Sequence, residues 1–505
     1  MKVAVIDVGF NSLKMVKYKV EADGSAKSYG QLGAMVRLGE GLDRSGLLGI
    51  EPIERTLDAI RLCRQAATLE SIKHVLLIGT SPVREAANRE EFLRRVELET
   101  GLRMRVLTGD EEALYGFLGA ARSVNAPTVL FFDLGGGSLE MIYAKEGEIR
   151  RILSLPLGAL KLTSRYGGKE GCFSRKKRAR MRKRISQLLP TRHELNLDRS
   201  AVLVGTGGTV RAMARFHQEV TRYPFNKVHN YSMELDSIRE VNREFLSLKT
   251  SDLGRIDAVG EDRSRTVAAG TMVVRRLMEQ LDFERLMVST HGLRDGILTE
   301  FLTGGAHAPL SRRRVDEVER LLTRPDALPQ LPGGFEIVDR LVKVGIIDER
   351  QKMLLHLAAR RARSQECAEA DADSLFWVMM NDDLPMSHED QLFMAISAVR
   401  ARRPRPANWL LKRYGALLSR ADFKSVKTMG ACLRLMEVME RSAARFRVSY
   451  SGRLRIAVVA GEAPFPLELA KASALTLSSS IKRPVSVIIA GEGEKQNAEP
   501  AKVRS

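Results

Sequence analysis

Two nine-residue segments of the chain share one pattern of acidic, glycine and hydroxyl residues. They are Asp7–Met15 and Asp133–Met141, and five of their nine positions are identical. Each starts with an aspartate at the end of an apolar segment and leads into another, which predicts a duplicated strand–turn–strand unit. Glycine lets backbone N–H groups approach an anion closely. We therefore expect two hairpins that grip phosphate oxygens and a cation from both sides of one cleft; two ordinary Asp/Gly turns are the alternative.

Two more glycine-rich loops follow apolar segments, at Gly79–Ser81 and Gly205–Thr209. The second contains Gly207 and Gly208 and opens a predicted helix near Val210. Its free amides and the helix dipole would favour an anion at that point. The P-loop and the dinucleotide fingerprint are both absent from the sequence, so phosphate binding would depend on these other loops.

The candidate general base stands at the start of a predicted helix. Thr108 and Glu111 match a capping box, and acids are favoured at helix starts without any chemistry. At roughly 100° per residue, Glu112 points away from the apolar stripe that includes Leu114, whereas Glu111 lies nearer its edge. Glu112 is therefore free to face a cleft.

Two further side chains are candidates for binding phosphate or metal. Arg84 follows a strand and a proline at helix-start spacing, and its planar fork suits a phosphate. An exposed arginine on the first turn of a helix is the alternative. Glu140 would share one face of an extended strand with Ser138, which suits a carboxylate linked to a metal.

The 505 residues suggest about three domains, and the net charge of +19 favours an anionic partner. Eight of the ten residues in Arg175–Arg184 are basic, Arg175, Lys176, Lys177 and Arg178 among them. Eight like charges on a predicted helix repel one another, which favours a polyanionic ligand over a merely solvated face. Aromatic residues make up only 6%, which is poor for stacking single-stranded bases, so nucleic acid is not the expected partner.

Cysteine usage and hydropathy indicate the compartment. The four cysteines stand far apart with no C-x-x-C, which fits a reducing interior. Asp7 comes too early for the apolar core of a signal peptide, and no apolar run approaches the roughly 18 residues of a membrane span. We expect a cytoplasmic protein without membrane contact.

The apolar pattern divides the chain into an α/β part up to about residue 300, a helical part, and a short strand–helix–strand segment near the end. The expected strands of the first part are Val3–Asp7, Lys14–Val20, Val75–Gly79, Leu130–Asp133, Leu139–Tyr143, Val202–Gly205 and Leu286–Ser289. Its expected helices are Ile53–Leu69, Glu111–Ala121, Lys176–Leu189, Val210–Phe216, Ser237–Leu246 and Val267–Leu281. The expected domains are 1–122, 123–305, 306–445 and 446–495, followed by a disordered tail at 496–505.

As an ordered set, these motifs resemble the exopolyphosphatase / guanosine pentaphosphate phosphatase family of the sugar kinase–Hsp70–actin superfamily. The matching segments are Asp7–Ser12, Gly79–Ala86, Thr108–Ala113, Asp133–Glu140, Gly205–Thr209 and Leu293–Gly296. The resemblance implies two RNase H-like α/β domains with a cleft between them, followed by a mainly helical domain with a small α/β cap. The family removes terminal phosphate from polyphosphate, or the 5′ γ-phosphate from guanosine pentaphosphate.

The resemblance also implies roles for individual residues. It assigns Glu112 as the general base, with Glu111 beside it as the alternative, and Arg84 as a ligand of substrate phosphate. It places Asp133 and Glu140 near Mg²⁺, and Asp7 is counted with them. The phosphate oxygens would be held by Gly135, Gly136, Gly137, Asn11, Ser12 and Ser138.

Three functions remain open at this point. The first is a magnesium-dependent exopolyphosphatase, the second a guanosine pentaphosphate phosphatase, and the third a non-catalytic sensor of polyphosphate or alarmone. Phe10 and Thr290 stand where the family carries other residue types, which favours the sensor slightly, whereas the intact Glu112 and Asp133 weigh against it. The resemblance implies that the helical part is a domain of the HD type. Because it has no His-Asp dipeptide, we expect a degenerate domain without a metal site, with a structural, dimerising or polyphosphate-binding role in a homodimer.

Overall fold

The computed structural model of the chain divides into two compact units, Met1–Arg324 and Pro325–Ser505. The residues that it describes are 1–20, 26–121, 124, 126–168, 173–304, 334–362, 367, 369–382, 384, 386–441, 445–459 and 465–489. The boundary expected at 305/306 and the division at 324/325 both lie in 305–333, outside the described residues. The tail expected at 496–505 also lies outside them, as does 313–322, where the apolar pattern predicts the first helix of the helical part.

The first unit begins with a five-stranded sheet in the order β3-β2-β1-β4-β5. Its strands are β1 (Lys2–Val8), β2 (Leu13–Val20), β3 (Ala26–Ala34), β4 (His74–Gly79) and β5 (Met104–Val106). The first three are antiparallel, and β4 and β5 run parallel to β1. Successive side chains of a strand point to opposite faces. Ile6 of β1 accordingly packs with α2 (Ile50–Leu69) and α4 (Arg89–Thr100), and Val5 packs on the other face.

A six-stranded sheet in the order β10-β11-β9-β6-β7-β8 follows. Its strands are β6 (Thr128–Leu134), β7 (Leu139–Lys145), β8 (Glu148–Leu155), β9 (Val202–Thr206), β10 (Ser232–Glu234) and β11 (Arg285–Val288). One face is covered by α6 (Ala159–Tyr166), α7 (Arg175–Leu188), α8 (Gly208–Val220), α9 (Leu235–Ser247) and α12 (Val267–Leu281). The order β8-β7-β6-β9-β11 repeats β3-β2-β1-β4-β5, so the unit contains the expected pair of RNase H-like lobes.

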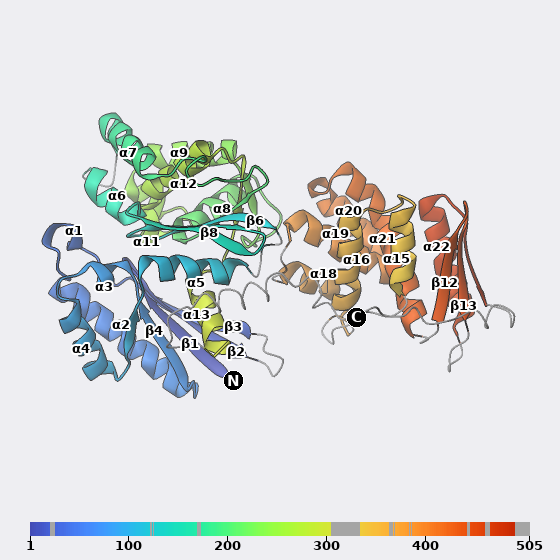
Figure 1. Cartoon of the computed structure of the whole chain (residues 1–505), viewed down its shortest axis with the longest axis horizontal. Coiled ribbons are helices and arrows are strands. Elements are labelled where there is room, and N and C mark those ends of the chain that lie inside the picture. Colours follow the sequence, from blue (N-terminus) through green and yellow to red (C-terminus); the bar gives the residue numbers. More distant parts are fainter. Residues whose placement is uncertain are drawn as a thin grey trace. The chain divides into compact units, whose positions relative to one another are not determined.

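Two helices lie between the sheets, α5 (Gly109–Ala121) and α13 (Leu293–Leu302), as Figure 1 shows. Val5 of the first sheet and Phe131 of the second belong to one hydrophobic cluster with Leu114 and Phe117 of α5. Because both sheets contact it, α5 is buried all round after its first turn and not along a single stripe. Helix α13 comes from the second half of the sequence but packs against α5 and β1.

The short helices of the first unit are α1 (Leu42–Ser45), α3 (Ser81–Glu85), α10 (Thr250–Gly254) and α11 (Glu261–Ser264). All seven strands and six helices expected in this unit are present, with ends shifted by a few residues. Strands β3, β5, β8 and β10 were not expected.

The second unit is mainly helical, as expected. Its helices are α15 (Gly334–Lys343), α16 (Glu349–Ala362), α18 (Ala372–Asn381), α19 (His388–Arg402), α20 (Pro404–Tyr414), the 3₁₀ turn η3 (Gly415–Leu417) and α21 (Arg420–Arg441). Almost every residue of α19 from His388 to Val399 is buried, so α19 forms the centre of this unit. The unit ends in a three-stranded sheet of β12 (Arg445–Tyr450), β13 (Leu454–Val459) and β14 (Val485–Ile489), in which α22 (Leu467–Ile481) connects the parallel β13 and β14.

No helix among the described residues is long and apolar enough to cross a membrane.

Candidate active site

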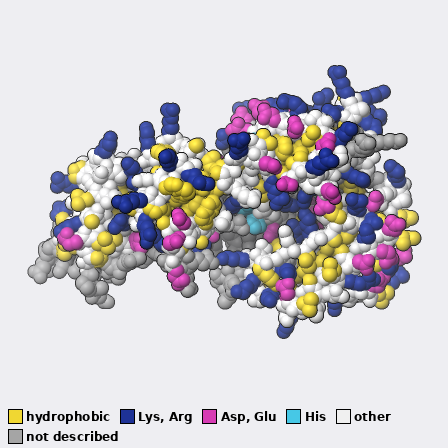
Figure 2. All heavy atoms as spheres, turned by 180° about the vertical axis from the view of Figure 1, so that it is seen from behind, with side chains coloured by type: hydrophobic (Ala, Val, Ile, Leu, Met, Phe, Trp, Pro, Cys, Tyr) yellow, Lys and Arg dark blue, Asp and Glu magenta, His cyan; other side chains and the backbone are white. Residues whose placement is uncertain are grey.

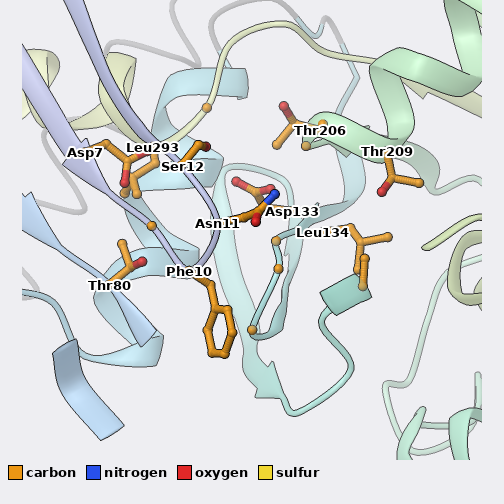
Figure 3. Close-up of a pocket in the computed structure, with 18 of the residues that line it drawn as sticks. Asp7, Phe10, Asn11, Ser12, Thr80, Asp133, Leu134, Thr206, Thr209 and Leu293 are labelled. Carbon is orange, nitrogen blue, oxygen red and sulfur yellow. The ribbon is translucent and has the colours of Figure 1, made fainter. Parts of the chain in front are cut away.

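A cavity of about 220 Å³ opens where the carboxyl ends of β1, β4, β6 and β9 face one another. Parallel strands place the loops after their carboxyl ends at one edge of a sheet, where ligands of α/β folds bind. Figure 3 shows Asp7 and Ser12 on one side of this cavity, Thr206 and Thr209 on the other, and Asp133 between them. The four glycine-rich loops predicted from the sequence therefore meet at one place.

The two copies of the repeated segment form matching hairpins. In the first, Gly9 donates a backbone hydrogen bond to Ser12 at 3.1 Å, and in the second Gly135 donates one to Ser138, also at 3.1 Å. The expected duplication is therefore confirmed at the level of single hydrogen bonds. Asn11, Ser12, Ser138 and the three glycines Gly135, Gly136 and Gly137 all line the cavity.

The glycines of the second loop are required by space. A Cβ atom on Gly137 would lie 2.3 Å from Ser81 Oγ, and one on Gly136 would lie 3.2 Å from Phe10 Cβ. Gly137 thus approaches the loop after β4, and Gly136 approaches the first hairpin. A residue with a side chain would not allow such close approach of the backbone.

The third loop brings the start of α8 to the cavity. Gly207 has φ 111° and lacks room for a side chain, since a Cβ atom would lie 2.4 Å from the Leu134 carbonyl oxygen. No side chain caps the first turn of α8, and Gly208 and Thr209 line the cavity. Free amides at a helix N-terminus favour an anion, as predicted for Gly207 and Gly208.

Glu112 lines the cavity and is held by Arg84. The Arg84 guanidinium donates to Glu112 Oε2 at 3.1 Å and to the Leu107 carbonyl oxygen at 2.7 Å. Burial raises the pKa of Glu112 well above its usual value, the charge of Glu140 raises it further, and Arg84 opposes both. Arg84 itself is not among the lining residues, so the structure places it behind Glu112.

Glu111 has a different place from its neighbour. Its Oε2 accepts from the Thr108 amide at 2.9 Å while its own amide donates to Thr108 Oγ1 at 3.1 Å, which is the expected capping box. Arg105 contacts its other carboxylate oxygen at 2.8 Å. Glu111 therefore stabilises the start of α5 and does not line the cavity.

Burial raises the pKa of three more acids that line the cavity, Asp7, Asp133 and Glu140. The pKa of Asp133 rises to about 6 and that of Glu140 to about 7, and Glu140 accepts a hydrogen bond from Ser154 at 3.0 Å. The pKa of Asp7 is raised as well, although Arg294 contacts it at 3.3 Å. In Asp133 and Glu140 a neighbouring acid adds to the effect of burial.

These acids fit a magnesium ion. Mg²⁺ prefers oxygen ligands and is usually held by one or two carboxylates together with substrate phosphates and water. The raised pKa values show that Asp133 and Glu140 lie near other acids, a repulsion that a divalent cation would relieve. Within the described residues there is no ready-made group of three or more acidic, histidine or cysteine ligands.

Four basic side chains that were not predicted also line the cavity. They are Lys14 of β2, Arg211 of α8, Arg263 of α11 and Arg294 of α13. Burial, and after it the charge of Arg211, lowers the pKa of Lys14 to about 7. Burial and the charge of Arg294 lower the pKa of Arg211 to about 10. Cations that depress one another's pKa values form a site for a multiply charged anion.

The basic segment predicted to bind substrate lies outside the cavity, on α7. Arg175 and Lys176 are exposed, whereas Lys177 donates to the Gly167 carbonyl oxygen at 2.9 Å and Arg178 to that of Phe173 at 2.7 Å. Two of the four therefore anchor the helix. Figure 2 shows many Lys and Arg side chains at the upper right, where α7 lies after the half-turn from Figure 1.

Two RNase H-like lobes with matching hairpins at the cavity between them define a protein of the actin-like fold class. Residues 20–304 match the Ppx/GppA phosphatase family, and the chain belongs to this family. Exopolyphosphatase 1 of Mycobacterium tuberculosis is 27% identical over 310 residues, which are 61% of this chain and 90% of that protein. Guanosine-5′-triphosphate,3′-diphosphate pyrophosphatase of Vibrio vulnificus is 24% identical over 63% of this chain and 62% of its own length.

A solved structure agrees with the fold and with the family. The crystal structure of the Aquifex aeolicus member of the Ppx/GppA family is 27% identical, has a TM-score of 0.51, and covers 61% of this chain and 99% of its own. As a member of this family, the chain is a phosphoanhydride hydrolase.

Proposed function

We propose that the chain is a magnesium-dependent exopolyphosphatase that releases orthophosphate from the end of inorganic polyphosphate. The observation that carries the proposal is the cavity itself, which is lined by two facing glycine loops, four cations and Glu112. The relatives named exopolyphosphatase and the exposed basic residues of α7 support polyphosphate as the substrate.

Each group has a role in the reaction. Glu112 takes a proton from the attacking water, and a base is most efficient when its pKa lies near the working pH. Arg84 orients the Glu112 carboxylate through the 3.1 Å contact. The amides of Gly135, Gly136 and Gly137 would bind the transferred phosphoryl group and hold it in line with the water.

Charge neutralisation falls to the remaining residues. Lys14, Arg211 and Arg294 would contact phosphate oxygens, where negative charge is spread in the transition state. Asp133 and Glu140, with Asp7 nearby, would hold Mg²⁺, which when bound neutralises charge on the substrate oxygens.

Guanosine pentaphosphate is the second candidate substrate, because one relative is named for the hydrolysis of that nucleotide. Both substrates end in a phosphoanhydride, and the proposed cavity would bind only the terminal phosphate groups. The cytoplasmic location and the homodimer stay predictions.

Phosphate release from long-chain polyphosphate and from guanosine pentaphosphate, measured side by side with and without Mg²⁺, tests the proposal. We expect a higher kcat/KM for polyphosphate and loss of activity with a chelator. Asp133→Asn protein purified in the same way controls for contaminating phosphatases. A higher kcat/KM for the nucleotide would select the second candidate, and binding of either ligand without phosphate release would indicate the sensor.

A further inference from the structure

A second and larger cavity, which we call the outer chamber, adjoins the catalytic cavity. Its volume is about 1040 Å³, against about 220 Å³ for the catalytic cavity. Five residues line both cavities, so the two are contiguous. These shared residues are Phe10, Asn11, Leu160, Asp262 and Thr266.

The passage between the two cavities is bordered by the ring of Phe10. This side chain is only 5% exposed. A Cβ atom on Gly39 would lie 2.2 Å from Phe10 Cε1, and one on Gly137 would lie 2.8 Å from Phe10 Cδ2. In Figure 3 the ring points away from Asp133. Phe10 and Leu160 thus form an apolar border between two polar chambers.

Cations outnumber acids among the described residues that line the outer chamber. Four cations line it, and none of their side chains forms an ion pair or hydrogen bond with another described residue. They are Arg37, Arg44, Lys249 and Arg265. Of the three lining acids, Glu40 contacts Arg55 at 3.3 Å, which leaves Glu261 and Asp262. Uncommitted cations around a cavity attract a polyanion.

The chamber also lies beside the basic helix α7. Gly167 and Gly168 line it, and the Gly167 carbonyl oxygen accepts the hydrogen bond from Lys177 of α7 at 2.9 Å. The exposed Arg175 and Lys176 stand at the start of the same helix. Positive groups therefore extend from the catalytic cavity through the outer chamber to the surface.

We propose that the outer chamber is a second phosphate-binding site, which holds inner phosphates of a polyphosphate chain while the terminal phosphate occupies the catalytic cavity. This inference rests on the proposed function. A nucleotide fits the chamber less well, because Phe10 is the one aromatic residue among the described lining residues and its ring is packed against glycines. Nucleobases are commonly held by stacking on accessible aromatic rings.

The test removes the charge of the chamber and leaves the catalytic cavity intact. In the chamber variant, Arg37, Arg44, Lys249 and Arg265 are each replaced by Gln. A matched control replaces Lys73, Arg94, Arg103 and Arg199, which are exposed, line neither cavity, and carry the same four charges. Lys73, Arg103 and Arg199 precede β4, β5 and β9 and therefore lie at the opposite end of the sheets.

The readout is the KM for long-chain polyphosphate divided by the KM for tripolyphosphate, together with the equilibrium affinity for the long chain. We expect this ratio to rise about tenfold or more in the chamber variant, since each lost contact weakens binding modestly and four are lost. The plot of log affinity against log salt should become shallower by about 3, at roughly 0.7 per contact by analogy with single-stranded nucleic acids. The control variant should match the wild type in the KM ratio and in the salt dependence of the affinity.

A steric variant keeps the inference testable if the charge variant fails to fold. Ser164 is exposed on α6 and lines the chamber, so Ser164→Trp should fill part of it without changing charge. We expect the KM ratio to rise here as well.

Three outcomes would overturn the inference: equal KM changes for both chain lengths, the same change in the control variant, or a larger effect on guanosine pentaphosphate than on polyphosphate. The proposed function can fail separately. If the wild type releases no phosphate but its affinity for long-chain polyphosphate falls in the chamber variant alone, the second site stands and the catalytic proposal is wrong.

Discussion

When no ligand is present, the acids that line the catalytic cavity repel one another, and so do the cations. Burial raises the pKa of Asp133 and of Glu140, and it lowers the pKa of Lys14. In each of the three, a neighbouring group of like charge adds to the effect. Such a site lowers the stability of the empty protein, and the proposed ligands, phosphate and Mg²⁺, would relieve the repulsion.

Glu140 gives a prediction about stability and pH. Its pKa rises from 4.5 to about 7 in the folded state, so the folded protein holds this proton more tightly and loses stability as pH rises through that window. Glu140→Gln removes the ionisation and can still accept the hydrogen bond from Ser154. Without Mg²⁺, the variant should be more stable than the wild type above pH 7, by on the order of 3 kcal/mol, and equal to it below pH 4.5.

Melting temperatures across this pH range measure the effect. Glu300→Gln serves as the control, because Glu300 is also buried but bonds Arg105 at 2.8 Å and Tyr115 at 2.6 Å outside the cavity. The control should be less stable than the wild type at pH 7 and above, because Gln does not form the ion pair with Arg105. A Glu140→Gln protein that is less stable than the wild type above pH 7 would contradict the account.

The sequence predicts the acids of the cavity better than its cations. Asp7 and Asp133 stand in a repeated pattern, and helical geometry separates Glu112 from Glu111. Lys14 belongs to the same repeat, and its position in the first copy is equivalent to that of Glu140 in the second copy. This equivalence is the signal by which the sequence could have identified Lys14 as a lining residue. Arg211 and Arg263 belong to separate helices far along the chain, and no local spacing relates them before the chain is folded.

At the scale of elements, α5 and α13 meet through their backbones. A Cβ atom on Gly119 would lie 2.0 Å from the Gly292 carbonyl oxygen, and one on Gly296 would lie 1.9 Å from that of Tyr115. Glycine at both positions lets the helices approach closely. The contact also fixes the start of each helix, where Glu112 and Arg294 face the cavity.

Gly296→Ala should separate α5 from α13. The added methyl group has no space, so we expect a loss of about 1–3 kcal/mol of stability and a lower kcat, because Glu112 and Arg294 shift together. Thermal unfolding and phosphate release measure the two effects. Gly254→Ala is the matched control, since its Cβ atom would lie 3.7 Å from the nearest atoms. Wild-type kinetics in the Gly296 variant would show that the close contact does not position the site.

Two of the four unexpected strands of the first unit lack the pattern from which a strand is predicted. Strands β3 and β8 lie at sheet edges, and most of their residues are exposed or half-buried. An edge strand without a buried face lacks the apolar alternation by which strands are predicted. The central strands β1 and β6 are almost continuously buried and were expected with nearly their observed ends.

Helix α7 gives a prediction that depends on which of its faces is exposed. Because Lys177 and Arg178 anchor the helix, the variant to make is the replacement by Gln of Arg175, Lys176, Arg180, Arg182 and Lys183, which are all exposed. We expect weaker binding of long-chain polyphosphate and a shallower salt dependence, with little change for tripolyphosphate. Unchanged affinity for both lengths would show that this face is only solvated.

At the scale of the whole molecule, every described residue that lines the catalytic cavity belongs to the first unit. The alignment with exopolyphosphatase 1 of Mycobacterium tuberculosis covers 310 residues, which are 61% of this chain and 90% of that protein. We therefore expect the phosphatase chemistry to depend on side chains of the first unit.

A chain that ends at Gly304 should accordingly fold and keep the kcat of the full-length protein on tripolyphosphate. Cooperative thermal unfolding and initial rates of phosphate release test this. Comparison with long-chain polyphosphate then shows what the helical unit adds to substrate binding. A truncated chain that unfolds cooperatively but has lost its kcat would mean that the helical unit takes part in catalysis.

The central claim is that Glu112 activates the attacking water. The measurement is kcat for phosphate release by Glu112→Gln and Glu111→Gln, with polyphosphate affinity determined at equilibrium for both. We predict that Glu112→Gln still binds polyphosphate but loses at least about 10²-fold in kcat. Glu111→Gln should keep its kcat and lose at most about 1 kcal/mol of stability, because Gln keeps the capping box but not the ion pair with Arg105. The reverse pattern, an active Glu112→Gln beside an inactive and stable Glu111→Gln, would contradict the account.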